Sequence, residues 1–111
     1  MRSWYLVVAA AICLAANVAR AQHAAAELRG VVLDAQDAVL PGVRLTVRDL
    51  QTGTFRQTTS NEDGTYFVGG LAPGTYEIRA LLPGFKPYAQ PGLQLEVGRT
   101  TTVNVTLELG S

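Results

Sequence analysis

Two turn signals lie close together around one short strand pattern, and this arrangement restricts the fold more than any other part of the chain. Asp63-Gly64 predicts a tight turn, because glycine reaches positive φ without steric cost and aspartate can hydrogen-bond the backbone of its own turn. The β-branched and aromatic segment 65–68 follows at once, and Pro73-Gly74 predicts a second turn. Connections this short are typical of hairpins, so an antiparallel all-β domain is expected.

Similar patterns continue on both sides of this unit. Apolar and polar side chains alternate clearly in 43–49, 75–82 and 100–109, as on strands with one buried face. Gly42 and Gly84 each follow a proline and predict further turns. Strands are expected at residues 28–33, 43–49, 54–60, 65–68, 75–82, 93–97 and 100–109. With no helical periodicity after the N-terminal segment, the predicted fold is all-β, a seven-stranded antiparallel Greek-key β-sandwich.

Two of the expected segments have special positions. The polar, threonine-rich segment 54–60 suits a sheet edge, where unpaired backbone groups are available to a partner strand. Segment 85–92 contains two prolines, which cannot donate to the ladder of a central strand, so we expect a loop there. Phe85 and Tyr88 are the candidate exposed aromatic side chains of this loop, although packing of Phe85 beneath the loop is the commoner role for such a ring.

The first 21 residues predict a cleaved signal peptide. A positive start at 1–3 is followed by an apolar run at 4–16 and by Ala19-Arg20-Ala21, the small-x-small pattern that precedes cleavage. That apolar run is shorter than the roughly 20 residues that a membrane-spanning helix needs. We therefore expect a signal peptide at 1–21, a tether at 22–27 and one β-sandwich domain at 28–109, exported to the periplasm or the outer membrane.

Composition argues against catalysis and against nucleic-acid binding. His23 is the only histidine, Cys13 lies within the predicted signal peptide, and no zinc-ligand spacing or nucleophile-base arrangement exists, so no catalytic, cofactor or metal residue is expected. Acidic side chains near Asp34 and Asp63 could offer oxygen ligands to Ca²⁺, but their spacing fits no EF-hand. Seven basic and nine acidic residues follow residue 21, and the basic ones are dispersed. Nucleic-acid binding needs clustered Lys and Arg, so it is not expected.

Several motifs, taken in order, resemble the carboxypeptidase regulatory-like domain. They are G-V-V-L-D-A-Q-D-A-V-L-P-G-V-R-L-T-V at 30–47, T-G at 52–53, D-G-T-Y at 63–66, G-L-A-P-G-T-Y at 70–76 and P-G-F at 83–85. The resemblance covers residues 28–109. It implies a transthyretin-like sandwich of about seven strands, grouped with carbohydrate-binding-like folds and without peptidase activity.

The resemblance also implies a cellular context. In bacteria, domains of this family that follow a signal peptide often resemble the N-terminal extension of TonB-dependent receptor-type outer-membrane proteins. We therefore expect a non-catalytic, exported interaction module whose partner is another protein or the rest of a longer receptor chain. The alternatives are a carbohydrate-binding module that uses Phe85 and Tyr88, and a structural spacer or stabilising domain. Neither a nucleic-acid partner nor a membrane span is expected in the mature domain.

Overall fold

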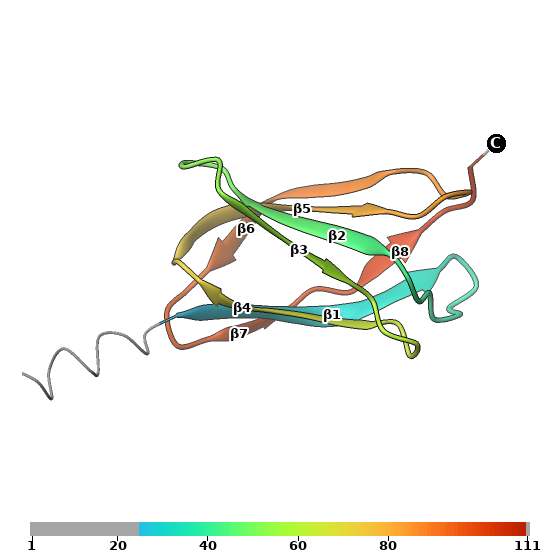
Figure 1. Ribbon diagram of the computed structural model, residues 1–111, viewed down its shortest axis with the longest axis horizontal. Coiled ribbons are helices and arrows are strands. Elements are labelled where there is room, and N and C mark those ends of the chain that lie inside the picture. Colours follow the sequence, from blue (N-terminus) through green and yellow to red (C-terminus); the bar gives the residue numbers. More distant parts are fainter. Residues whose placement is uncertain (1–24, 111) are drawn as a thin grey trace, which may run out of the picture.

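Two β-sheets pack face to face as a sandwich in the computed structural model, which describes residues 25–110 (Figure 1). The prediction of an all-β sandwich is confirmed. The predicted signal peptide and the first residues of the tether lie outside the described residues. Within residues 25–110, no helix is long and apolar enough to cross a bilayer.

Each sheet contains four strands. The strands are β1 (Ala26–Asp34), β2 (Arg44–Asp49), β3 (Phe55–Thr59), β4 (Thr65–Leu71), β5 (Gly74–Leu81), β6 (Tyr88–Leu95), β7 (Thr100–Thr102) and β8 (Val105–Leu107). One sheet has the order β4-β1-β7, with β8 also paired to β1, and the other has the order β3-β2-β5-β6. Because β1 begins at Ala26, the end of the expected tether is already part of the first strand.

The final strand differs from the prediction. The segment expected as one strand at 100–109 forms two short strands, β7 and β8, and both run parallel to β1, so the sandwich is not purely antiparallel. Between them, the Val103 N–H donates to the Arg29 carbonyl at 2.8 Å, and the Asn104 side chain accepts from the Val31 N–H at 3.1 Å. A side-chain oxygen thus replaces a ladder bond where the strand is interrupted.

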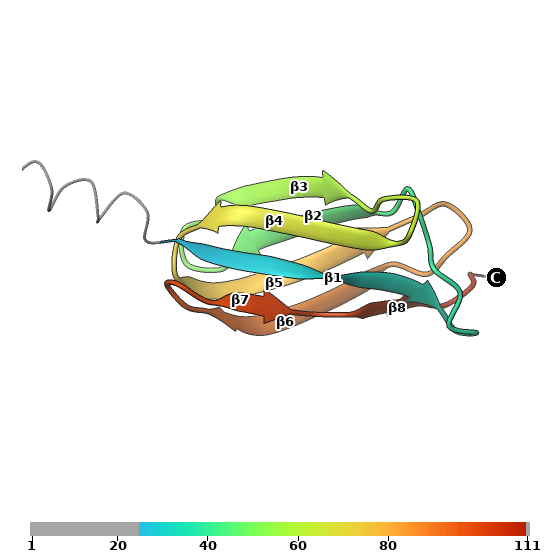
Figure 2. The ribbon, with the colours of Figure 1, turned by 90° about the horizontal axis from the view of Figure 1, so that it is seen from below.

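Both short connections around β4 cross between the sheets. Strand β3 belongs to one sheet, β4 to the other, and β5 again to the first (Figure 2). The hairpin interpretation of these turns was therefore wrong. Packed sheets lie only about 10 Å apart, so a connection of a few residues can span them as readily as it joins neighbours in one sheet.

Residues 88–92 are part of β6 and not of a loop, which corrects the expectation for this segment. Strand β6 is the last strand of its sheet, and its register against β5 shifts between Tyr76 and Ile78, opposite Pro91-Gly92. Gly92 has a φ of 77° there. Proline is tolerated in an edge strand and at a bulge, because no ladder bond needs its missing N–H.

Alternate side chains of both sheets form the core. The inward faces predicted for Val43, Leu45 and Val47 and for Ile78 and Ala80 are confirmed, since all five side chains are fully buried. Burying a leucine, valine or isoleucine side chain contributes about 1.5–3 kcal/mol. The largest fully buried side chains are Leu28, Leu45, Ile78, Leu95, Leu107, Val32, Val43, Val47 and Val105.

Tyr66 connects β4 to the interruption between β7 and β8. Its buried hydroxyl donates to the Val103 carbonyl at 2.5 Å, and its backbone partner across the β1–β4 pair is Gly30. Burial, with a smaller contribution from Tyr88, raises the pKa of the Tyr66 hydroxyl well above its usual value. The folded protein therefore holds the phenolic proton more tightly than the unfolded chain. The associated stabilisation is complete below pH 10 or so and is lost as the pH rises further.

Replacing the Tyr66 hydroxyl tests this contact. Tyr66→Phe is expected to lower the free energy of unfolding by about 1 kcal/mol at pH 7, since the Val103 carbonyl loses its donor. It should also make the alkaline loss of stability less steep than in the wild type. Urea unfolding at neutral and alkaline pH measures both effects. Tyr88→Phe is the control, because the Tyr88 hydroxyl donates to Gln90 in a partly exposed position; equal losses in both variants would contradict a special role for Tyr66.

Candidate interaction site at the open edge of the sandwich

One side of the sandwich is open. Strands β3 and β4 are each the last strand of their sheet and lie near each other on this side (Figure 2). A hollow of about 230 Å³ lies at the opening, lined by residues of β2 to β5 that include Arg56, Leu71 and Tyr76. We call this region, the β3 edge with its hollow, the open edge.

Strand β3 confirms the expectation of an edge strand at 54–60. It pairs with β2 alone, and none of its five side chains is fully buried. Arg56 pairs with the inward-facing Val47, so Arg56 points toward the inside of the sandwich. Phe55 and Gln57 point outward, because side chains alternate along a strand.

Arg56 reaches across the opening to the other sheet. Its Nη1 donates to the Gly69 carbonyl on β4 at 2.9 Å. In residues 25–110 the ion pairs involve Arg79, Lys86 and Arg99, so the Arg56 guanidinium, which has five N–H donors, keeps its charge without a direct carboxylate partner. In the sequence Arg56 is one of seven dispersed basic residues and was not a candidate; the detectable sign was a basic residue on a strand expected at an edge.

Tyr76 lines the hollow, and Asp49 pairs with it across the β2–β5 ladder. The Tyr76 hydroxyl donates to the Ala72 carbonyl at 2.7 Å, and burial, with a contribution from the charge of Asp49, raises the pKa of Tyr76, while Arg56 opposes that shift. The buried Asp49 side chain accepts hydrogen bonds from the N–H groups of Gln51 and Thr52 at 2.9 and 3.2 Å. Asp49 therefore holds its own turn, and its charge also acts on Tyr76 beside the hollow.

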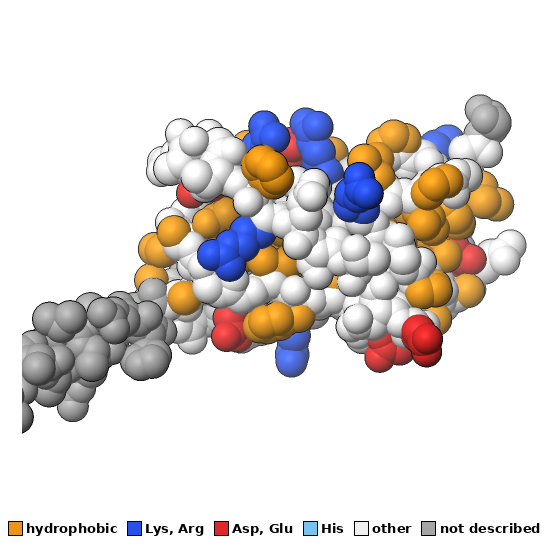
Figure 3. Space-filling model, viewed as in Figure 1, with side chains coloured by type: hydrophobic (Ala, Val, Ile, Leu, Met, Phe, Trp, Pro, Cys, Tyr) orange, Lys and Arg blue, Asp and Glu red, His pale blue; other side chains and the backbone are white. Residues whose placement is uncertain are grey.

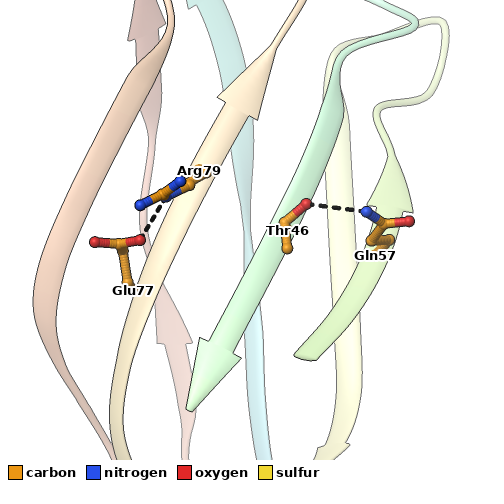
Figure 4. Close-up of polar contacts among 4 residues, drawn as sticks. All are labelled: Thr46, Gln57, Glu77 and Arg79. Carbon is orange, nitrogen blue, oxygen red and sulfur yellow. Dashed lines mark hydrogen bonds and ion pairs between the residues drawn. The ribbon is translucent and has the colours of Figure 1, made fainter. Parts of the chain in front are cut away.

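The outer face beside β3 is polar and basic. Gln57 donates to the Thr46 hydroxyl at 3.3 Å, and Arg79 donates to Glu77 at 2.5 Å (Figure 4). Arg48 lies over the ring of Phe55, 5.7 Å from its centroid, and this ring is 54% exposed. Most of the Lys and Arg side chains visible in Figure 3 lie over β2, β3 and β5.

Four residues expected in turns, Gly42, Asp63, Gly64 and Gly84, lie in turns or bends of the structure. Asp63 accepts hydrogen bonds from the Thr65 hydroxyl at 2.6 Å and the Thr65 N–H at 3.1 Å, and these bonds, the side-chain one first, lower the pKa of Asp63. Gly64 has a φ of 79°. Gly42 and Gly84 also have positive φ, at 75° and 90°.

The second predicted turn, at Pro73-Gly74, differs from the expectation because Gly74 already belongs to a strand. Pro73 lies in the connection between the sheets, and Gly74 is the first residue of β5. Gly74 is not among the glycines with positive φ. A glycine is therefore not required at this position by the backbone conformation.

Phe85 and Tyr88 lie at the other end of their sheet from β3. Both side chains are partly buried and pack against the core. Phe85 forms an isolated bridge with Leu109, and the Tyr88 hydroxyl donates to the Gln90 side chain at 2.6 Å. The structure does not bring these two aromatic residues to the open edge.

The acidic loop residues hydrogen-bond to backbone. Asp34 Oδ1 accepts from the N–H groups of Gln36 and Ala38 at 2.8 and 3.0 Å, as Asp63 does from Thr65. Among residues 25–110, no group of three or more His, Cys, Asp and Glu side chains is placed to hold a metal ion. His23 and Cys13 lie outside the described residues.

Comparison with solved structures agrees with the sandwich fold. The TIE protein of Bacillus anthracis superposes with a TM-score of 0.66 at 18% identity, covering 78% of this chain and 17% of that chain. Hydroxyquinol 1,2-dioxygenase of Pseudomonas putida DLL-E4 gives a TM-score of 0.64 at 12% identity, covering 78% of this chain and 57% of that chain. At such low identity both likenesses show the fold alone.

Comparison of sequences identifies the family. The TonB-dependent transporter Oar of Myxococcus xanthus is 35% identical over 107 residues, which is 91% of this chain but 9% of that relative. The chain thus spans less than a tenth of the length of this relative. The sequence model of the carboxypeptidase regulatory-like domain matches residues 27–108, which include all eight strands apart from the first residue of β1. The chain belongs to the carboxypeptidase regulatory-like domain family.

Proposed function

We propose that this chain is a non-catalytic, exported accessory module that acts by contact, as the N-terminal domain of a TonB-dependent receptor-like outer-membrane protein. The observation that carries the proposal is the 35% identity to a TonB-dependent transporter across 91% of this chain. The partner in this proposal is the rest of a longer receptor chain or a separate periplasmic protein, and the surface offered to it is the open edge.

The geometry of the open edge supports contact in preference to chemistry. The hollow is small, and its polar side chains are Arg56, the Tyr76 hydroxyl already bonded to a carbonyl, and the Thr54 hydroxyl, which hydrogen-bonds with Thr52. A nucleophile with an adjacent base, the usual requirement for covalent catalysis, is not present among these lining residues. An exposed edge strand, by contrast, offers backbone hydrogen-bonding groups to another chain.

Intact-mass analysis of the native product in separated periplasmic and outer-membrane fractions tests the cellular context. We expect a membrane-bound species much heavier than 11.8 kDa that contains this sequence near its N-terminus. A soluble periplasmic product that ends at Ser111 would contradict the receptor context. Exchanging the domain for an unrelated sandwich is the control for a passive spacer, because full function of that chimera would show that no specific contact is needed.

A further inference from the structure

The register of β3 against β2 determines which backbone groups are left unpaired. The Ser60 N–H donates to the Val43 carbonyl and the Asp49 N–H to the Thr54 carbonyl. The backbone N–H and C=O groups of the even-numbered residues of β3 therefore point toward β2. Hydrogen-bonded and non-hydrogen-bonded pairs alternate in an antiparallel ladder. The N–H and C=O groups of Phe55, Gln57 and Thr59 therefore point away from β2, along the free edge.

The other edges of the two sheets are interrupted. Strand β6 carries Pro91 and a bulge, β4 contains Gly70 with a φ of 66°, and the edge formed by β7 and β8 breaks at Val103 and Asn104. Prolines and bulges are the usual means by which sheet edges resist pairing with another chain. In the described part of the chain, β3 is the edge with an unbroken register along its whole length.

Positive charge outnumbers negative charge at this edge. Strands β2 and β3 carry Arg44, Arg48 and Arg56 but one carboxylate, the buried Asp49, and Glu77 of β5 pairs with Arg48. Opposite charges directly across a strand pair stabilise it, and like charges weaken it. A strand added beside β3 would also send every second side chain toward the hollow, where Arg56 lies.

We propose that the β3 edge binds an extended acidic peptide segment by β-strand addition, with a carboxylate of that segment at the mouth of the hollow beside Arg56. Backbone bonds to Phe55, Gln57 and Thr59 supply the pairing, and Arg56, together with the net positive charge of β2 and β3, supplies the preference for acidic side chains. This inference deepens the proposed contact function, but it does not depend on the receptor context.

Hydrogen exchange of the purified protein, with and without a capped synthetic peptide of alternating threonine and glutamate, is the test. The peptide is expected to slow exchange of the Phe55, Gln57 and Thr59 amides, while the Arg56 and Thr58 amides, which already face β2, change little. A peptide of alternating threonine and lysine is the matched probe and should protect these amides far less. Absence of protection at millimolar acidic peptide, or equal protection by both peptides, would overturn the proposal.

Two variants separate backbone pairing from charge. Gln57→Pro removes an N–H that β2 does not use, so the fold should persist while peptide affinity falls about fivefold to tenfold. Arg56→Gln should weaken binding up to about fivefold and reduce its dependence on salt. Arg29→Gln, on the exposed surface of the other sheet, is the control and should leave affinity unchanged. Unchanged peptide affinity in both Gln57→Pro and Arg56→Gln would contradict peptide binding at the β3 edge.

The two proposals fail in different measurements. A soluble periplasmic product would remove the receptor context and leave peptide binding at β3 intact. A heavy outer-membrane product whose β3 amides are unprotected by the acidic peptide would keep the receptor context and remove strand addition.

Discussion

Gly30→Ala is expected to lower the free energy of unfolding by about 3 kcal/mol, or to prevent folding. A Cβ at Gly30 would lie 1.8 Å from the Val103 carbonyl oxygen and 2.7 Å from the carbonyl carbon, and both distances are shorter than a van der Waals contact. That carbonyl is held in place, because it accepts a hydrogen bond from the Tyr66 hydroxyl and the Val103 N–H donates one to the Arg29 carbonyl. The methyl group would therefore push the segment between β7 and β8 away from β1. Urea unfolding followed by circular dichroism measures the loss.

Gly74→Ala is the matched control, since it makes the same chemical change in a strand glycine. The nearest atoms to a Cβ there are Asp49 Oδ2 at 3.6 Å and a Tyr76 ring carbon at 3.8 Å, which are ordinary contacts. Alanine at a compatible backbone position restricts the unfolded chain, so stability should be unchanged or higher by up to about 1 kcal/mol. Equal urea midpoints for the Gly30 and Gly74 variants would contradict the close approach at Gly30.

Gly64→Val is expected to cost about 2 kcal/mol or more, through two separate effects. Gly64 has a φ of 79°, a conformation in which a side chain is strained. Its Cβ would also lie 2.9 Å from the Val32 carbonyl oxygen and 3.0 Å from Val39 Cβ. The Val32 carbonyl is already used by the Leu40 N–H, and the Val32 N–H donates to Gly64 itself, so neither side can withdraw easily. The urea midpoint is again the measurement.

Gly42→Val separates the two effects. Gly42 has a nearly equal φ of 75°, but nothing lies within 4 Å of a Cβ placed there. The control should lose about 1 kcal/mol from backbone strain alone. A larger loss at Gly64 then reports the contacts with β1 and with the loop that follows it. An unchanged midpoint for Gly64→Val would contradict the turn at Asp63-Gly64.

Much of the local structure was predictable from the chain. Alternation identified the inward faces at Val43, Leu45 and Val47, and composition identified 54–60 as an edge strand. These predictions succeed because side-chain direction along a strand and the aversion of polar segments to the core are set within a few residues.

The candidate site was only partly predictable. An edge strand was expected, but its hollow and the bond from Arg56 to the Gly69 carbonyl depend on β4, which is in the other sheet. The aromatic candidates, Phe85 and Tyr88, were chosen because a proline-rich segment suggested an exposed loop, and that segment is instead partly an edge strand packed on the core. Phe55, on β3 itself, is the more exposed ring.

The sequence by itself determined the positions of most strands, the turn at Asp63-Gly64 and the inward faces of β2 and β5, since turn chemistry and the two-residue period act between near neighbours. Only the tertiary structure decided which strands pair, that β7 and β8 run parallel to β1, and that both connections of β4 cross between the sheets. Those choices rest on contacts between distant residues, such as Asn104 with Val31, 73 positions apart, and Tyr66 with Val103, 37 positions apart. No local pattern encodes such pairs, because they form only when the packed sheets bring the two segments together.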